Sequence, residues 1–110
     1  MVSTEFLNKK TELFKQLRAA KELTADLEKA VIDTYGPRGK RALDAVKGGG
    51  VRKQEGRWFV RGKDAEYEIV RTYCTCYDYV LNVVTEKVDV DMCYHALAKS
   101  ISELLATRRR

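Results

Sequence analysis

The first part of the chain carries a helical pattern of apolar positions from residue 3 to residue 47. Apolar side chains recur there at spacings of three, four or seven, which places them on one helix face: Phe6, Leu13, Phe14, Leu17, Ala20, Leu27, Ala30 and Val31. Thr24 is a suitable cap for a second segment, so the pattern fits one long helix or two. The pattern ends at Gly36 and Pro37, because proline disfavours helix for the residue before it. Pro37 also suits the first position of another helix, over residues 37–47.

A run of three glycines, residues 48–50, separates this pattern from a different one. Residues 51–54 and 57–61 are expected to form a hairpin, with Glu55 and Gly56 at its turn. Residues 66–73 begin with the alternation of polar and apolar side chains that is typical of a half-buried strand. The stretch 77–91 fits either strand or a short helix, and Val88 and Val90 suit one more short strand.

The carboxy-terminal part predicts an amphipathic helix. Leu97, Ile101, Leu104 and Leu105 follow the spacing of one helix face, and Asp91 is a favourable N-cap for a helix that begins at Met92. The chain is therefore divided into a helical arm (residues 1–47), a glycine linker (48–50) and a second unit (51–110). We predict an α+β fold, in which the arm precedes a small antiparallel β-meander and a carboxy-terminal helix.

All three cysteines and the only histidine fall into two pairs of equal spacing, Cys74 with Cys76 and Cys93 with His95. Three cysteines and one histidine form a familiar ligand set for tetrahedral structural zinc. In an extended segment residues i and i+2 point to the same side, so the first pair can bind one ion. In a helix they diverge by about 200°, so the second pair must straddle a helix start. We expect these four side chains to bind one structural Zn²⁺ and join the sheet to the last helix.

Other uses of these residues are less suitable. Buried thiols and a core histidine are common, but they do not require paired positions. A Cys-x-Cys pair lacks the Cys-x-x-Cys spacing of thioredoxin-like redox sites. An iron–sulfur cluster normally takes four thiolates.

The composition predicts a cytoplasmic protein of one domain. Its 110 residues are 34% charged, with a net charge of +5. The first residues lack the pattern of a signal peptide, the apolar runs are too short for a membrane span, and an odd number of cysteines argues against a disulfide framework. We therefore expect no membrane partner.

The basic surplus lies before residue 74, in the arm and the hairpin. On the hairpin, basic side chains flank Trp58 and Phe59, which is the mixture that single-stranded nucleic acids exploit. The candidate nucleic-acid-binding residues are Arg52, Lys53, Arg57, Trp58, Arg61 and Lys63. The plainer interpretation is a sheet that buries its aromatic side chains and leaves its cations solvated. DNA, single- or double-stranded, is the expected nucleic acid.

The metal-binding pattern also resembles a known family. A Cys-x-Cys pair followed, after a gap, by Cys-x-His at a helix start is similar to the SWIM-type zinc finger. The similarity covers residues 51 to about 105, and its matching segments are 58–62 (Trp-Phe-Val-Arg-Gly), Tyr67, 74–78 (Cys-Thr-Cys-Tyr-Asp) and 93–98 (Cys-Tyr-His-Ala-Leu-Ala). The resemblance implies zinc ligation by Cys74, Cys76, Cys93 and His95, and a module that binds DNA or proteins. It is greatest to small stand-alone archaeal SWIM proteins, kin to Shu-type recombination accessory subunits, and so implies a role in recombination or repair.

Two other classes of function were weighed. The apolar stripe and the Lys/Glu-rich outer face of the arm are typical of a helix-pairing surface, which favours a protein–protein adaptor or self-association through the arm. The alternative for that stripe is packing on the sheet. An enzyme is not expected, because four protein ligands leave zinc no open position and the chain has no second histidine to act as a base. A small-molecule substrate is not expected either.

Overall fold

The computed structural model describes residues 2–109, and it has the predicted α+β fold. None of the helices within these residues combines the length and the apolar character that crossing a membrane requires. The elements, in chain order, are α1 (Thr4–Ala19), α2 (Ala25–Tyr35), α3 (Pro37–Lys47), β1 (Val51–Gln54), β2 (Arg57–Arg61), β3 (Glu66–Ile69), the π-helix η1 (Tyr79–Val83) and α4 (Tyr94–Arg109).

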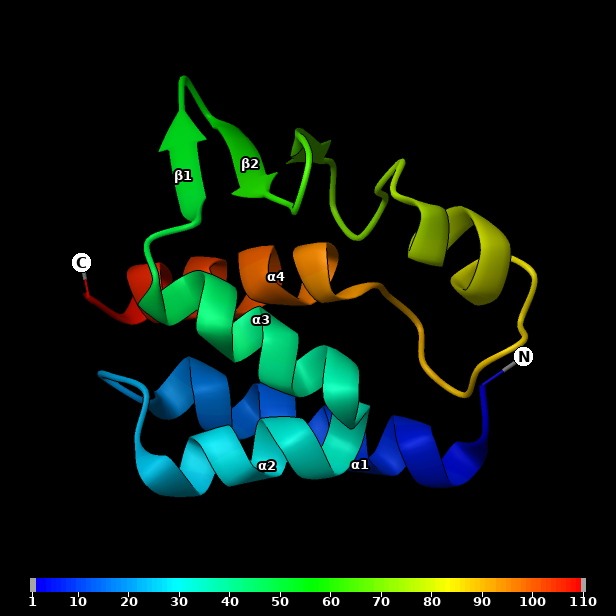
Figure 1. The fold of residues 1–110 in the computed structure, drawn as a ribbon. Helices are drawn as coiled ribbons and strands as arrows, with labels where there is room; N and C mark the ends of the chain where they lie inside the picture. Colours follow the sequence, from blue (N-terminus) through cyan, green and yellow to red (C-terminus); the bar gives the residue numbers. More distant parts are fainter. Residues whose placement is uncertain (1, 110) are drawn as a thin grey trace.

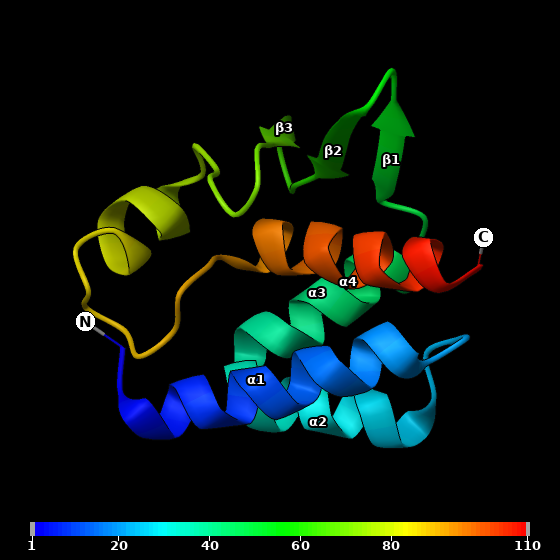
Figure 2. The ribbon, with the colours of Figure 1, turned by 180° about the vertical axis from the view of Figure 1, so that it is seen from behind.

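Helix α4 is the central element of the fold. The sheet lies on one side of it and the helices α1, α2 and α3 lie on the other (Figure 1), and the view from behind shows the same order (Figure 2). Helix α4 packs against α1, α3 and all three strands. A helix enclosed on every side must be buried all round. After the half-buried Tyr94, seven consecutive residues of α4 are buried: His95, Ala96, Leu97, Ala98, Lys99, Ser100 and Ile101.

The arm consists of two helices before Gly36 and a third after it. Thr24 separates the first two, because its side chain accepts a hydrogen bond from the Leu27 amide (3.2 Å) and so caps α2. Pro37 is the first residue of α3, as predicted. The predicted apolar stripe faces the core, where Phe14, Ala20 and Ala30 are partly buried and its other members are buried. Helix α1 packs against α2 and α4, and α2 packs against α3. The arm and the residues after the glycines thus share one hydrophobic core.

The three strands form an antiparallel sheet in the order β1-β2-β3. Val51 pairs with Val60, which pairs with Tyr67, so these side chains share one face. Val60 is fully buried, which places this face toward the core. Phe59 lies on the opposite face, paired with Arg52.

The third strand is shorter than predicted, because it ends at Ile69 and not at residue 73. Val70 and Tyr73 exchange two backbone hydrogen bonds (3.3 and 2.9 Å), which close a tight turn. Arg71 lies in this turn with a φ of 58°, in the left-handed region. The turn reverses the chain, so Cys74 comes back toward the core, where it is fully buried.

The predicted strand at Val88 and Val90 is absent, and residues 88–91 have no regular structure. Two side-chain contacts hold this segment against α1 instead. Asp89 accepts hydrogen bonds from the amide and hydroxyl of Ser3 (both 2.6 Å), and Val90 is buried in the core. Packing against the arm therefore replaces strand pairing.

Asp91 is not the N-cap of the last helix, which begins at Tyr94 and not at Met92. Its carboxylate instead accepts a hydrogen bond from the Tyr35 hydroxyl (3.0 Å) and forms an ion pair with Lys10. Burial first, and then the charge of Asp91, raise the pKa of Tyr35 above its ordinary value. One carboxylate thus joins α1 and α2 to the start of α4.

Replacing Asp91 should weaken this connection. Asp91→Ala is expected to lower the free energy of unfolding by about 2–3 kcal/mol, because an ammonium and a phenol lose a charged acceptor. Asp89→Ala serves as the control, since its bonds to Ser3 are exposed and should contribute less than about 1 kcal/mol. Chemical denaturation monitored by circular dichroism measures both, and equal losses would contradict a special role for Asp91.

Candidate metal centre

The two pairs identified in the sequence meet at one buried point. Cys74, Cys76, Cys93 and His95 each offer a donor atom, and these atoms all lie within 4.8 Å of one another. The Sγ atoms of Cys74 and Cys93 are each 3.9 Å from Nδ1 of His95. Two donors at the corners of a tetrahedral thiolate–imidazole site lie about 3.6–3.8 Å apart when the metal–ligand bonds are of ordinary length. The four residues therefore fit a tetrahedral metal ion.

Each pair is fixed by a helical turn that follows it. Cys93 caps α4, because its carbonyl accepts from the Leu97 amide (3.0 Å) and its Sγ accepts from the Ala96 amide (3.5 Å). The second pair thus straddles a helix start, as predicted. Cys76 has the same relation to η1, since its Sγ accepts from the Tyr79 amide (3.4 Å). Amide donors at a helix start favour a negatively charged sulfur, and hence metal ligation.

The three thiols titrate as a group. The Cys76 thiolate accepts hydrogen bonds from Cys74 and Cys93, which lowers the pKa of Cys76. The same interaction raises the pKa of Cys74 to about 11. Cys93 also has a raised pKa, first through its hydrogen bond with Cys74 and then through that with Cys76 and through burial. A bound cation is what would allow all three to ionise together, because it offsets their mutual repulsion.

His95 is oriented toward the cysteines by a close fit on its other side. Its Nδ1 faces the thiols, whereas Nε2 is buried and has no hydrogen-bond partner among the described residues. Gly62 lies against Nε2, and a Cβ at that position would be 2.9 Å from Nε2 and 2.7 Å from the ring of Tyr67. The absent side chain of Gly62 thus makes room for both rings.

The arm holds the chain beside both pairs. Arg38 on α3 makes two hydrogen bonds to Asp78 (2.8 and 2.6 Å), two residues after Cys76. These bonds lower the pKa of Asp78, and Asn82 donates a further hydrogen bond to it (3.0 Å). Asp91, two residues before Cys93, is held by the arm as well. Both ends of the site therefore depend on contacts that cross the glycine linker.

Two of the hairpin candidates are already paired within the sheet. Arg52 makes two hydrogen bonds to Glu66 (2.9 and 2.8 Å), and Arg57 makes two to Glu68 (2.8 and 2.7 Å). Both guanidinium groups also lie over the ring of Phe59, at 4.3 and 5.3 Å from its centroid. The charges of these two arginines are thus matched by carboxylates of β3, which lies next to the strand of Arg57 and two strands away from Arg52.

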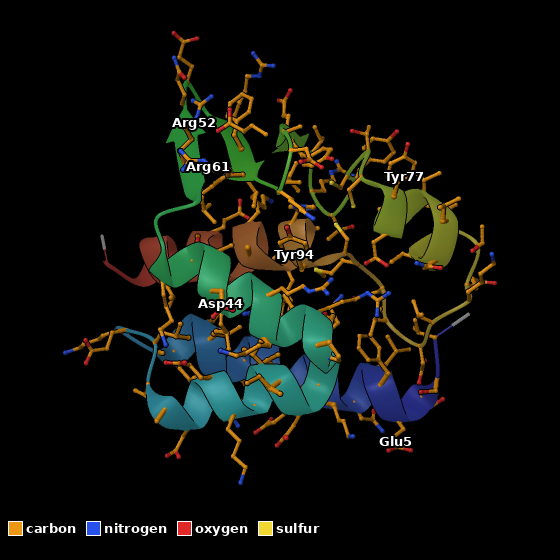
Figure 3. All side chains as sticks on the ribbon, viewed as in Figure 1. Glu5, Asp44, Arg52, Arg61, Tyr77 and Tyr94 are labelled. Atoms are coloured by element: carbon orange, nitrogen blue, oxygen red, sulfur yellow. The ribbon has the colours of Figure 1, made fainter. Side chains whose placement is uncertain are left out.

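The other candidates have no carboxylate partner of this kind among the described residues and lie at two different places. Lys53 lies over the half-buried ring of Trp58, 5.3 Å from its centroid. Arg61 and Lys63 are exposed and line a cavity of about 380 Å³ together with Arg41 of α3 and Tyr94 of α4. Figure 3 shows Arg61 between Arg52 and Tyr94 on one side of the molecule. Arg41 and Tyr94 lie outside the predicted hairpin and were not among the predicted binding residues.

Comparison with known proteins gives one distant likeness. An uncharacterized protein of Archaeoglobus fulgidus is 28% identical over 94 residues, which are 86% of this chain and 77% of that protein. No protein-family model matches the chain, and no solved structure matches it significantly. The SWIM resemblance therefore rests on the motif and stays a prediction.

Removing one ligand should abolish metal binding. Cys93→Ser is expected to lose the bound metal and to lower the free energy of unfolding by roughly 3 kcal/mol or more, because metal-binding free energy becomes folding free energy. Thr75→Ala is the matched control, since Thr75 is exposed between two of the cysteines. Elemental analysis and thermal denaturation measure both effects, and a Cys93→Ser protein with one equivalent of metal would refute the ligand assignment.

Proposed function

We propose that the chain is a non-catalytic SWIM-type zinc module that binds DNA, or a DNA-processing protein, as an accessory factor in recombination or repair. The observation that carries the zinc proposal is the convergence of four buried donor atoms within 4.8 Å. The role in recombination or repair follows from the resemblance of the motif to the SWIM family.

Zinc is the metal that suits this donor set best. Three thiolates and one imidazole in tetrahedral geometry form a typical structural zinc site, whereas magnesium and calcium prefer oxygen ligands. Four protein ligands leave no position for a water or substrate, so the proposed zinc is structural. Its role is to fix the turn after β3 against the start of α4. Binding would then be performed by the protein surface around the metal.

Charge is what favours nucleic acid as the partner. The net charge is +5. Three exposed cations, Arg41, Arg61 and Lys63, meet at one cavity. Arg41 and Lys63 have no ion pair with any side chain that the structure describes, and Arg61 lies opposite Glu66, which is itself paired with Arg52. Unpaired cations can neutralise phosphates without first breaking an internal pair, and this supports DNA binding.

Purified protein should contain one equivalent of zinc and bind DNA in a salt-dependent way. Fluorescence anisotropy with labelled single- and double-stranded DNA is expected to give micromolar or tighter binding at low salt. This binding should weaken steeply as salt rises, because phosphate contacts release counterions. Protein stripped of zinc is the control and should bind at least about ten-fold more weakly, because its surface is no longer fixed. A zinc-loaded protein that binds neither DNA at low salt would rule out the DNA-binding part of the proposal.

A protein–protein adaptor is the second candidate, and one observation favours it. Large apolar side chains are exposed along residues 70–84, on the turn after β3 and on η1: Val70, Tyr73, Tyr77, Val80, Leu81 and Val84. The arm has less exposed apolar surface for a partner, because its stripe faces the core and its exposed large apolar side chains are Leu7 and Ile32. An adaptor would therefore bind through residues 70–84 and not through the arm, and a second copy of the chain is the simplest partner to test.

The adaptor alternative predicts a dimer in solution. Light scattering would give twice the chain mass, and Leu81→Lys/Val84→Lys would restore the monomer by placing charges in an apolar contact. Leu7→Lys/Ile32→Lys is the matched control on the arm and should leave the dimer intact. A monomeric wild-type protein at high concentration would count against self-association through either surface.

A further inference from the structure

Two adjoining cavities form a groove between α3 and the β2–β3 turn. The first has a volume of about 380 Å³ and includes Arg61, and the second has a volume of about 450 Å³ and includes Tyr77. They share Arg41, Lys63 and Tyr94 in their linings. Figure 3 shows Arg61, Tyr94 and Tyr77 in succession across this side of the molecule. The groove therefore leads from the end of β2 to the residue that follows Cys76.

The lining of this groove is positively charged. Arg41, Arg61 and Lys63 are exposed, and none of them forms an ion pair in the part of the chain whose side chains are described. The carboxylate opposite Arg61, that of Glu66, is hydrogen-bonded to Arg52. Two of the carboxylates in the lining are engaged elsewhere, Asp44 with Lys40 (3.3 Å) and Asp78 with Arg38. A third, Asp64, lies in the lining of the second cavity. Cations that line a concave surface focus their field there, so the groove attracts anions more strongly than scattered surface lysines do.

An aromatic side chain lies at one end of the groove. Tyr77 is 83% exposed, whereas a tyrosine with a purely structural role buries most of its ring. Its position is fixed from both sides, because Cys76 belongs to the metal centre and Asp78 is bound by Arg38. An exposed aromatic ring beside a line of cations is the combination that binds single-stranded nucleic acid, whose bases are free to stack.

We propose that this groove is the binding site for single-stranded nucleic acid. Arg41, Arg61 and Lys63 contact successive phosphates, and Tyr77 stacks on a base. This inference rests on the proposed function and adds the strand type and the residues that bind it. A duplex is less suited, because its bases are stacked on each other and offer no face to Tyr77. An acidic protein segment would use the cations but would gain little from the ring.

The test uses pairs of variants that remove the same charge from different places. Anisotropy of zinc-loaded full-length protein is measured with labelled oligothymidylate, oligouridylate and duplex DNA at several salt concentrations. Arg41→Ala/Lys63→Ala is expected to weaken binding of single strands at least about ten-fold and to reduce the salt slope by about 1.4, the value for two lost phosphate contacts. Arg52→Ala/Arg57→Ala should change affinity by less than about two-fold, because those charges are already paired.

Stacking is tested separately from charge. Tyr77→Ala should weaken single-strand binding about ten-fold or more, and Tyr77→Phe should restore it, because the ring and not the hydroxyl makes the contact. Zinc content and melting temperature, unchanged in each variant, show that the fold is intact. Polyglutamate, added at the same total charge as the nucleic acid, should compete poorly with it for the protein.

Several results would overturn the groove. The groove is not the binding site if Arg41→Ala/Lys63→Ala keeps wild-type affinity, or if it loses no more affinity than Arg52→Ala/Arg57→Ala. The same conclusion follows if duplex DNA binds more tightly than single strands, or if polyglutamate competes as well as nucleic acid does. If the wild-type protein binds DNA and the groove variants are unaffected, the groove fails and the proposed function remains. If the wild-type protein binds no nucleic acid, the groove and the DNA-binding part of the proposed function both fail.

Discussion

The convergence of four buried donor atoms is the constraint on which the rest of the arrangement depends. Cys74 and Cys76 follow the sheet, and Cys93 and His95 open α4, so their meeting point fixes the sheet against the helix that fills the core. Three thiols this close repel one another when ionised. Hydrogen bonds between them already divide their pKa values, since the pKa of Cys76 is lowered while those of Cys74 and Cys93 are raised. A cation bound between the three sulfurs would attract each thiolate and so offset their mutual repulsion. Metal binding would then be coupled to folding.

The helical arm takes part in this site although the glycines separate it in the sequence. Arg38 holds Asp78 beside one cysteine pair, and Lys10 with Tyr35 holds Asp91 beside the other pair. Partners of this kind orient the segments that carry metal ligands, so ligand geometry depends on how the arm packs. The influence runs in both directions, because the ligand segments also provide the surface that the arm covers. One shared core is the consequence.

Local signals in the sequence were sufficient for most elements and for the grouping of the three cysteines with His95. Thr24 and Pro37 mark helix starts through their own chemistry, and paired cysteine spacing requires no tertiary information. The turn at Arg71 was not predictable, because an arginine with positive φ carries no turn signal of the kind that glycine gives. Asp91 was misassigned for another reason. A carboxylate before a helix looks the same in sequence whether it caps that helix or binds Lys10 on a distant one.

The same limit applies to charge, which a sequence counts but does not pair. By sequence Arg52 and Arg57 are equivalent to Arg61 and Lys63 on the hairpin, yet in the sheet Arg52 is paired with Glu66 and Arg57 with Glu68. A phosphate that bound there would have to displace a carboxylate with similar bidentate geometry, so little free energy would be gained. Lys63 has no such competitor among the described residues, and Arg61 lies opposite Glu66, whose two oxygens are already bound by Arg52. The docking of α3 on α4 brings Arg41 beside both cations. The number of unpaired cations on one face, and not the net charge, therefore determines where an anion can bind. That face exists only while the arm, α4 and the metal centre are held together.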